Sequence, residues 1–238
     1  MSRNFRLQRV GDVNWLLDKF KFKNIGDVID ELVIFNVDRN RPSFLNKAFF
    51  SDCEKLLENV YVPFAFGGGI GTIDEVNRCF LFGCDKVIFS TAFFDNRYII
   101  DFAKEHYGNQ AVVLNIDYKI EEGNRICYVN NGTQVQMNLI DCLKEVELYM
   151  PGELILNNIT NDGTGVGFDI ETIALVENAH IPIIIAGGAG KPEHFLTVLV
   201  NDHISAAATG NLFNFLGSGF YDVRKYLFEK GINVREIS

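Results

Sequence analysis

Short apolar runs alternate with amphipathic segments along the whole chain. The runs are rich in Val and Ile and lack the alternation of half-exposed strands, which is typical of parallel strands buried on both faces. We expect strands at Glu31–Val37, Val62–Phe66, Lys86–Ser90, Ala111–Asp117, Glu153–Asn158, Ile181–Ala186 and Ile204–Thr209. Helical periodicity lies between them, at Asp12–Phe22, Ser43–Asn59, Ile73–Phe82, Asp95–Tyr107, Met137–Tyr149, Asp169–Asn178, Lys191–Val200 and Gly219–Lys230.

This alternation predicts an α/β fold, a (β/α)8 TIM barrel formed by residues 1–238 as a single domain. The pattern has one defect. The chain opens on a helix, whereas a βα barrel opens on a strand, so the first strand is missing from the predicted set. A seven-strand barrel or an open sheet is the alternative.

An internal repeat divides the chain into two half-barrels. The segment Asp30–Asn40 aligns with Gly152–Asp162 at an offset of 122 residues, and the glycines Gly67–Gly69 align with Gly187–Ala189 at an offset of 120. By the same offset, the partner of strand Ala111–Asp117 falls before residue 1. We therefore expect the native chain to have an upstream first strand.

Composition narrows the functional classes. The formal net charge of −9 disfavours nucleic acid and acidic membranes as partners. No apolar run has the length of a membrane span, and the N-terminus lacks a signal-peptide core. The five cysteines show no CxxC spacing and the four histidines are scattered, so we expect reduced thiols, a cytoplasmic protein and no metal site.

Glycine-rich turns follow two of the predicted strands. In βα barrels the active site forms at the C-terminal ends of the strands, and glycine lets the backbone approach an anion closely. Polar residues end the next strand in each half. The sequence therefore predicts two phosphate sites related by the repeat, with glycine merely ending a strand as the alternative. The candidate residues are Gly68, Gly69, Ser90 and Thr91 for one site, and Gly188, Gly210 and Asn211 for the other.

Two aspartates are candidates for acid–base catalysis. Asp117 ends the fifth strand of the barrel count after an apolar run, where a carboxylate would be partly desolvated. Asp162 follows the sixth strand and precedes a glycine-rich segment, where it could act on the substrate or only shape the turn. The segment Tyr118–Gly132 reads as an inserted β-hairpin that could cover the site.

Charged residues begin three alternate strands: Glu31, Lys86 and Glu153. Alternate strands contribute side chains to one layer of a barrel interior. These residues could form a charged ring at the N-terminal end of the barrel, or face solvent.

Five segments together resemble the cyclase subunit of imidazole glycerol phosphate synthase: "FAFGGGI", "NIDYK", "DGTGVGFD", "IIIAGGAGKPEHF" and "YLFEKGINVREIS". The match is collinear from about Asn4 to the C-terminus. The resemblance implies a barrel of the ribulose-phosphate-binding type and an enzyme, a lyase of histidine biosynthesis that needs no cofactor. It also implies a substrate with a phosphate at each end, and ammonia supplied by a class I glutaminase at the N-terminal face of the barrel.

The resemblance also implies roles for individual residues. Asp117 matches one of the two catalytic aspartates of the family. Asp162 and Gly163 match residues around its second phosphate site. Glu31, Lys86 and Glu153 match three of the four residues of its ammonia gate. The second catalytic aspartate and the gate arginine belong to the first strand of the family, which has no counterpart here.

Three positions depart from the family pattern: Asn36 and Thr160 replace aspartates, and Ser90 replaces an asparagine. The opening "NFRLQRVGDVNWL" is closer to a paralogous branch associated with surface-glycan (lipopolysaccharide) genes. That branch implies an amidotransferase component that forms an acetamidino group on a nonulosonate sugar. A non-catalytic partner that activates the glutaminase is the third alternative.

Overall fold

The computed structural model describes residues 2–7, 9, 11–19, 22–37, 47–210 and 219–237. The chain forms two compact units, one comprising residues 11–114 and the other residues 1–10 together with 115–238. Strand β6 (Val112–Glu121) begins in the first unit and continues into the second.

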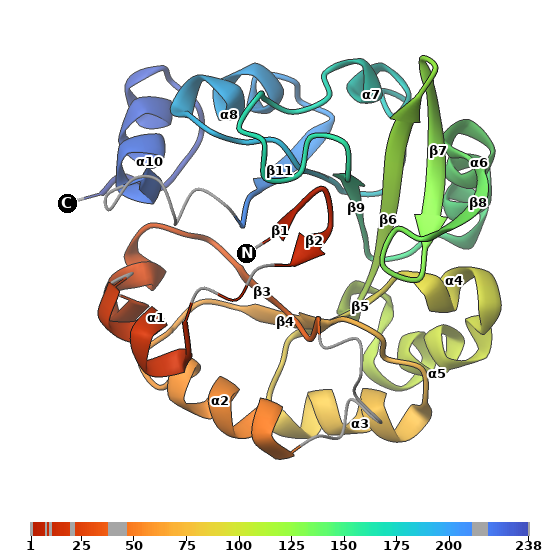
Figure 1. Cartoon of the computed structure of the whole chain (residues 1–238), viewed down its shortest axis with the longest axis horizontal. Helices are drawn as coiled ribbons and strands as arrows, with labels where there is room; N and C mark the ends of the chain where they lie inside the picture. Colours follow the sequence, from red (N-terminus) through yellow and green to blue (C-terminus); the bar gives the residue numbers. More distant parts are fainter. Residues whose placement is uncertain are drawn as a thin grey trace. The chain divides into compact units, whose positions relative to one another are not determined.

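The unit of residues 11–114 is a parallel sheet whose strands are joined along the chain by helices (Figure 1). Its order is β3 (Leu32–Phe35), β4 (Phe64–Gly67), β5 (Lys86–Phe89) and the start of β6. The helical segments are α1 (Val13–Lys19), the 3-10 helix η1 (Phe22–Asp27), α2 (Lys47–Leu57), α3 (Ile73–Phe82), α4 (Thr91–Asp95), α5 (Arg97–Tyr107) and η2 (Asn109–Ala111).

Aromatic rings form much of the core of this unit. Phe66 on β4 is fully buried and contacts the rings of Phe50, Phe64 and Phe82 at centroid distances of 5.4–5.7 Å. The helix α3 begins with a capping box, in which Thr72 and Glu75 satisfy each other's backbone N–H groups. The capping box satisfies backbone donors at the start of α3, and the Phe66–Phe82 contact packs the end of the helix against β4.

The second unit continues the sheet from β6 through β9 (Glu153–Asn158) and β10 (Ile183–Ala186) to β11 (Ile204–Ala208). Strand β7 (Asn124–Val129) forms an antiparallel hairpin with β6, and β8 (Gln134–Asn138) pairs antiparallel with β7. The helices are α6 (Leu139–Tyr149), α7 (Glu171–Ala174), α8 (Pro192–Leu199) and α10 (Gly219–Glu229), and α6 packs against β7 and β8 (Figure 1). A separate antiparallel pair, β1 (Ser2–Arg3) and β2 (Arg6–Leu7), precedes them in sequence.

The α/β fold class predicted from the sequence is confirmed, and each predicted strand is present with ends that differ by at most four residues. The hairpin predicted at Tyr118–Gly132 is also confirmed. Two helix predictions were wrong in detail. The segment Asp95–Tyr107 is interrupted at Asn96, so α4 and α5 are separate helices, and Asp169–Asn178 contains only the short helix α7.

The repeat holds, but its glycine alignment shifts by one residue. Gly68 and Gly69 both have positive φ, and so do Gly187 and Gly188. The equivalent of Gly68 is therefore Gly187, at an offset of 119 residues, instead of Gly188 as the sequence alignment placed it.

All five cysteines are free and buried, as expected for reduced thiols. Among the described residues, no helix combines the length and apolar character needed to cross a bilayer.

Candidate functional site

Asp117 is a buried carboxylate near the C-terminal end of the parallel part of β6. Its side chain is 9% exposed, and its Oδ1 accepts hydrogen bonds from the amides of Asn115, at 2.9 Å, and Asn157, at 2.8 Å. Asn157 lies near the end of the neighbouring strand β9. The predicted acid–base residue is thus held in place by two amides that sequence reasoning did not select.

Two glycine-rich loops in the same unit interlock. The loop after β9 contains Gly165 and Gly167, and the loop after β10 contains Gly188 and Gly190. The N–H of Gly167 donates to the carbonyl of Gly188 at 2.8 Å. A Cβ atom added to Gly188 would overlap the backbone carbonyl of Gly167. Glycine is needed because the two backbones touch, which leaves no room for a side chain.

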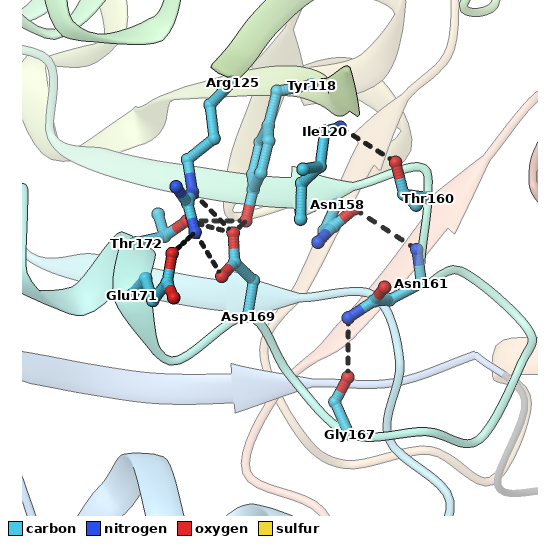
Figure 2. A network of polar contacts seen from close by, with 10 residues as sticks. All are labelled: Tyr118, Ile120, Arg125, Asn158, Thr160, Asn161, Gly167, Asp169, Glu171 and Thr172. Atoms are coloured by element: carbon cyan, nitrogen blue, oxygen red, sulfur yellow. Dashed lines mark hydrogen bonds and ion pairs between the residues drawn. The ribbon is translucent and has the colours of Figure 1, made fainter. Parts of the chain in front are cut away.

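Asn161 organises the loop after β9, as Figure 2 shows. Its Nδ2 donates to the carbonyl of Gly167 at 3.0 Å, and its N–H donates to Oδ1 of Asn158 at 3.2 Å. The hydroxyl of Thr164 donates to the carbonyl of Asn161 at 2.6 Å. The segment that contains the predicted site residue Gly163 is therefore fixed by its own side chains.

Asp162 lies in this loop and contacts the N-terminal pair of strands. Its backbone carbonyl accepts from the N–H of Asn4 at 2.9 Å, and its carboxylate accepts from the N–H of Phe5 at 3.4 Å. The Nδ2 of Asn4 also donates to the carbonyls of Ile159, at 3.2 Å, and Thr160, at 2.6 Å. The turn between β1 and β2 thus rests on the candidate residue, an arrangement that the sequence did not predict.

The other glycine turn, in the unit of residues 11–114, follows β4. A Cβ atom on Gly68 would overlap the backbone of Asn36, whose N–H donates to the carbonyl of Gly67 at 2.9 Å. Ser90 and Thr91 follow the neighbouring strand β5 and begin helix α4. The four predicted residues Gly68, Gly69, Ser90 and Thr91 therefore lie at the C-terminal ends of two paired strands.

At the N-terminal end of β5, Lys86 Nζ donates to both carboxylate oxygens of Glu31, which precedes β3, at 2.8 Å. The Lys86 side chain is 16% exposed, whereas that of Glu31 is 45% exposed. Glu153 begins β9 in the other unit. Two of the three predicted ring residues are thus paired.

A buried ion pair that the sequence reasoning missed joins β7 to the start of α7 (Figure 2). Arg125 contacts both carboxylate oxygens of Asp169, with Nε–Oδ2 at 2.7 Å and Nη2–Oδ1 at 2.6 Å. The hydroxyls of Tyr118 and Thr172 also donate to Asp169 Oδ2, at 3.1 and 2.6 Å. Arg125 lies in the hairpin and Asp169 follows the glycine loop, so the pair anchors both segments.

The charges of this network stabilise each other. Burial acts to raise the pKa of Asp169, but the hydrogen bonds from Arg125, Thr172 and Tyr118 outweigh it, and the pKa is lowered. The hydrogen bond to Asp169 raises the pKa of Arg125 above its ordinary value, and burial raises the pKa of the Tyr118 hydroxyl. Asp169 therefore stays ionised, and Arg125 and Tyr118 stay protonated, through neutral pH.

The structure says little about the last two predicted residues of the second phosphate site. Gly210 is exposed after β11, and Asn211 lies outside the described residues. Within the described part of the chain, no group of three His, Cys, Asp or Glu side chains could hold a metal ion.

The chain is similar to proteins of histidine biosynthesis. A family profile described as "Histidine biosynthesis protein" matches residues 28–217. A protein of Parasynechococcus marenigrum, provisionally named imidazole glycerol phosphate synthase subunit hisF2, is 35% identical over 92% of this chain and 81% of its own length. The imidazole glycerol phosphate synthase subunit HisF of Chlorobium luteolum is 31% identical over 98% of this chain and 92% of its own length. The protein of the same name in Saccharolobus solfataricus is 35% identical over 87% of this chain and 82% of its own length.

Proposed function

Because the chain belongs to the histidine biosynthesis protein family, we propose that it is the cyclase component of an imidazole glycerol phosphate synthase, which uses ammonia from a partner glutaminase. The fold class is that of this TIM-barrel family. The observation that carries the proposal is the buried carboxylate of Asp117 on β6, which two amides hold at the position where the family resemblance implies a catalytic aspartate.

In this function Asp117 moves protons while ammonia forms a C–N bond with the substrate and a second C–N bond breaks. A carboxylate in a largely buried position is suited to this work, because it faces the substrate rather than bulk water. The products are imidazole glycerol phosphate and an aminoimidazole carboxamide ribotide. Asp162 is the second candidate for proton transfer.

The glycine loops would hold the two phosphates of the ribulosyl aminoimidazole carboxamide substrate. Gly163, Gly188 and Gly210, together with Asn211, would bind one phosphate, and Gly68, Gly69, Ser90 and Thr91 the other. The positive φ of Gly68, Gly69 and Gly188 supports this assignment, because such turns expose backbone N–H groups to an anion. A two-point grip lowers the barrier by positioning alone.

Glu31, Lys86 and Glu153 would form the entrance for ammonia at the N-terminal ends of the strands, facing a class I glutaminase. The Glu31–Lys86 ion pair supports a charged entrance. Delivery inside the protein keeps ammonia unprotonated and hence nucleophilic. We propose that the protein works in the cytoplasm, without nucleic acid or membrane as a partner.

A second candidate is the surface-glycan paralogue, an amidotransferase component with another acceptor. Asn36 and Thr160 favour it, because two carboxylates of the family pattern are neutral here. The amides around Asp117 add further neutral hydrogen-bonding groups to the site.

The test is turnover by the chain together with its glutaminase. Consumption of the bisphosphorylated ribulosyl substrate, dependent on ammonia or glutamine and abolished by Asp117→Asn, would support the cyclase. Stimulation of the glutaminase without turnover would exclude the cyclase, and addition of a nonulosonate acceptor would then separate the paralogue from a non-catalytic activator.

A further inference from the structure

Two amide side chains converge on one oxygen atom of Asp117. Asn115 and Asp117 are two residues apart on β6, so they share one face of the strand. Asn157 reaches the same atom, Oδ1, from β9. Asn115 and Asp117 are 6% and 9% exposed, and Asn157 is half-buried.

This arrangement restricts how the carboxylate can turn. The terminal torsion of an aspartate side chain is otherwise broad, with no sharply preferred angle. A carboxylate oxygen offers about two lone-pair sites, so the two amide donors occupy Oδ1. Because an amide does not titrate, the two hydrogen bonds persist at any pH at which Asp117 is ionised.

We infer that Asn115 and Asn157 are positioning residues that hold the Asp117 carboxylate in the orientation in which it exchanges protons with the substrate. The inference rests on the proposed function. When ammonia adds to the ketone carbon of the ribulosyl group, a C–N bond forms and the carbonyl electron pair moves to oxygen. The Asp117 carboxylate then takes one proton from the new ammonium nitrogen and returns it to the alkoxide oxygen, which leaves a neutral carbinolamine and an ionised Asp117.

The neighbouring Asn158 shows that burial alone does not direct an asparagine to Asp117. Asn158 is completely buried, and its Nδ2 has no hydrogen-bond partner among the described residues. The next residue back along the strand, Asn157, instead donates to the carboxylate. Alternation along β9 accounts for the difference, because successive side chains point to opposite faces.

Kinetics of Asn115→Leu and Asn157→Leu, measured with the complete chain and free ammonia, test the inference. Leucine has a similar size and cannot donate. We expect kcat to fall by about 10²-fold, as for a reacting group that is misplaced by roughly 1 Å, with KM nearly unchanged.

Asn77→Leu is the matched control, because it also removes a half-buried amide in one side-chain hydrogen bond, with Tyr107 at 2.7 Å, but on helix α3. Asn157 is the more exposed of the two positions, so we expect Asn157→Leu to disturb folding less than Asn115→Leu. An unchanged kcat in Asn157→Leu, or a rise in KM alone, would overturn the positioning role.

Crystal structures of the same variants separate this inference from the cyclase assignment. We expect the Asp117 carboxylate to rotate in Asn157→Leu. A carboxylate that keeps its orientation refutes the positioning role, whether or not the wild-type chain turns over the substrate. A rotated carboxylate in a chain without wild-type turnover supports the positioning role and removes only the cyclase assignment.

Discussion

The backbone of Asn36 occupies the space in which Gly68 would carry a side chain, and Asn158 stands in the same relation to Gly187. Both asparagines follow or end a strand, and both glycines open the turn after the next strand of the sheet. The two halves of the repeat thus share one packing constraint.

Replacing either glycine by alanine should therefore be severe. Gly68→Ala and Gly187→Ala combine a left-handed φ, which costs an L-residue about 1–2 kcal/mol, with a backbone overlap that requires the strand ends to separate. We expect a total loss of about 4 kcal/mol or more in the free energy of unfolding. Chemical denaturation measures it.

Gly83→Ala is the control for this comparison. Gly83 also has a positive φ, +106°, but nothing lies within 4 Å of an added Cβ. It should lose only the conformational part, about 1–2 kcal/mol. Equal losses at Gly68 and Gly83 would show that the overlap is relieved at little cost.

The sheet was predictable because its strands are continuous apolar runs, such as Ile183–Ala186, flanked by glycine. The elements that were missed lack that signal. Strand β8, Gln134–Asn138, is mostly polar and pairs with β7 at the edge of the described sheet. The β1–β2 turn places Asn4 and Phe5 at positive φ, which is uncommon for Phe.

Asp117 could be selected as a candidate because its carboxylate follows an apolar strand run in the sequence, and its catalytic role stays a prediction. Its supporting residues were not selected, although Asn115 and Asn157 carry a readable signal. An asparagine inside an apolar strand run must find a hydrogen-bond partner once it is buried. Arg125 gives a weaker signal, because its partner Asp169 is 44 residues away and only the fold brings the two together.

Breaking the ion pair between Arg125 and Asp169 should destabilise the protein. Their side chains are 13% and 5% exposed, so Arg125→Met leaves a buried carboxylate without its counter-charge. We expect a loss of about 3–5 kcal/mol in the free energy of unfolding, with much of it recovered in the double variant Arg125→Met/Asp169→Leu. Urea denaturation of the single and double variants measures both.

Glu171→Gln is the matched control, since Glu171 also pairs with Arg125, at 3.0 Å, but is 85% exposed. Its loss should be within about 0.5 kcal/mol. A loss as large as that of Arg125→Met would mean that the exposed pair holds the segment. A double variant no more stable than Arg125→Met would contradict the account of an uncompensated charge.

Acidification should weaken the folded state through His194. Its Nδ1 accepts a hydrogen bond from the N–H of Gly190 at 3.1 Å, which requires a neutral ring nitrogen. Burial, followed by repulsion from Lys191, lowers the pKa of His194 below its ordinary 6.5. Between the lowered value and 6.5 the unfolded chain binds more protons, so stability falls as the pH drops below about 6.5.

His194→Gln keeps an acceptor but does not titrate, so it should flatten the pH dependence of unfolding between about pH 5 and 7. His203→Gln, which removes an exposed histidine, is the matched control. Denaturation midpoints at several pH values give the comparison. Parallel curves for His194→Gln and the wild type would rule out this contribution.

The turn between β1 and β2 should detach from Asp162 when Asn4 is replaced. Asn4→Ala removes two side-chain hydrogen bonds, to the carbonyls of Ile159 and Thr160, and places alanine at a φ of +50°. Loss of about 1–2 kcal/mol of local stability should speed hydrogen exchange at the amides of Asn4 and Phe5 by about tenfold, while the β9 and β10 amides keep their protection. Asn4→Gly separates the two causes, because glycine accepts the positive φ and loses only the side chain. Exchange in Asn4→Gly as slow as in the wild type would mean that backbone conformation, and not the Asn4 amide, holds the turn on the loop after β9.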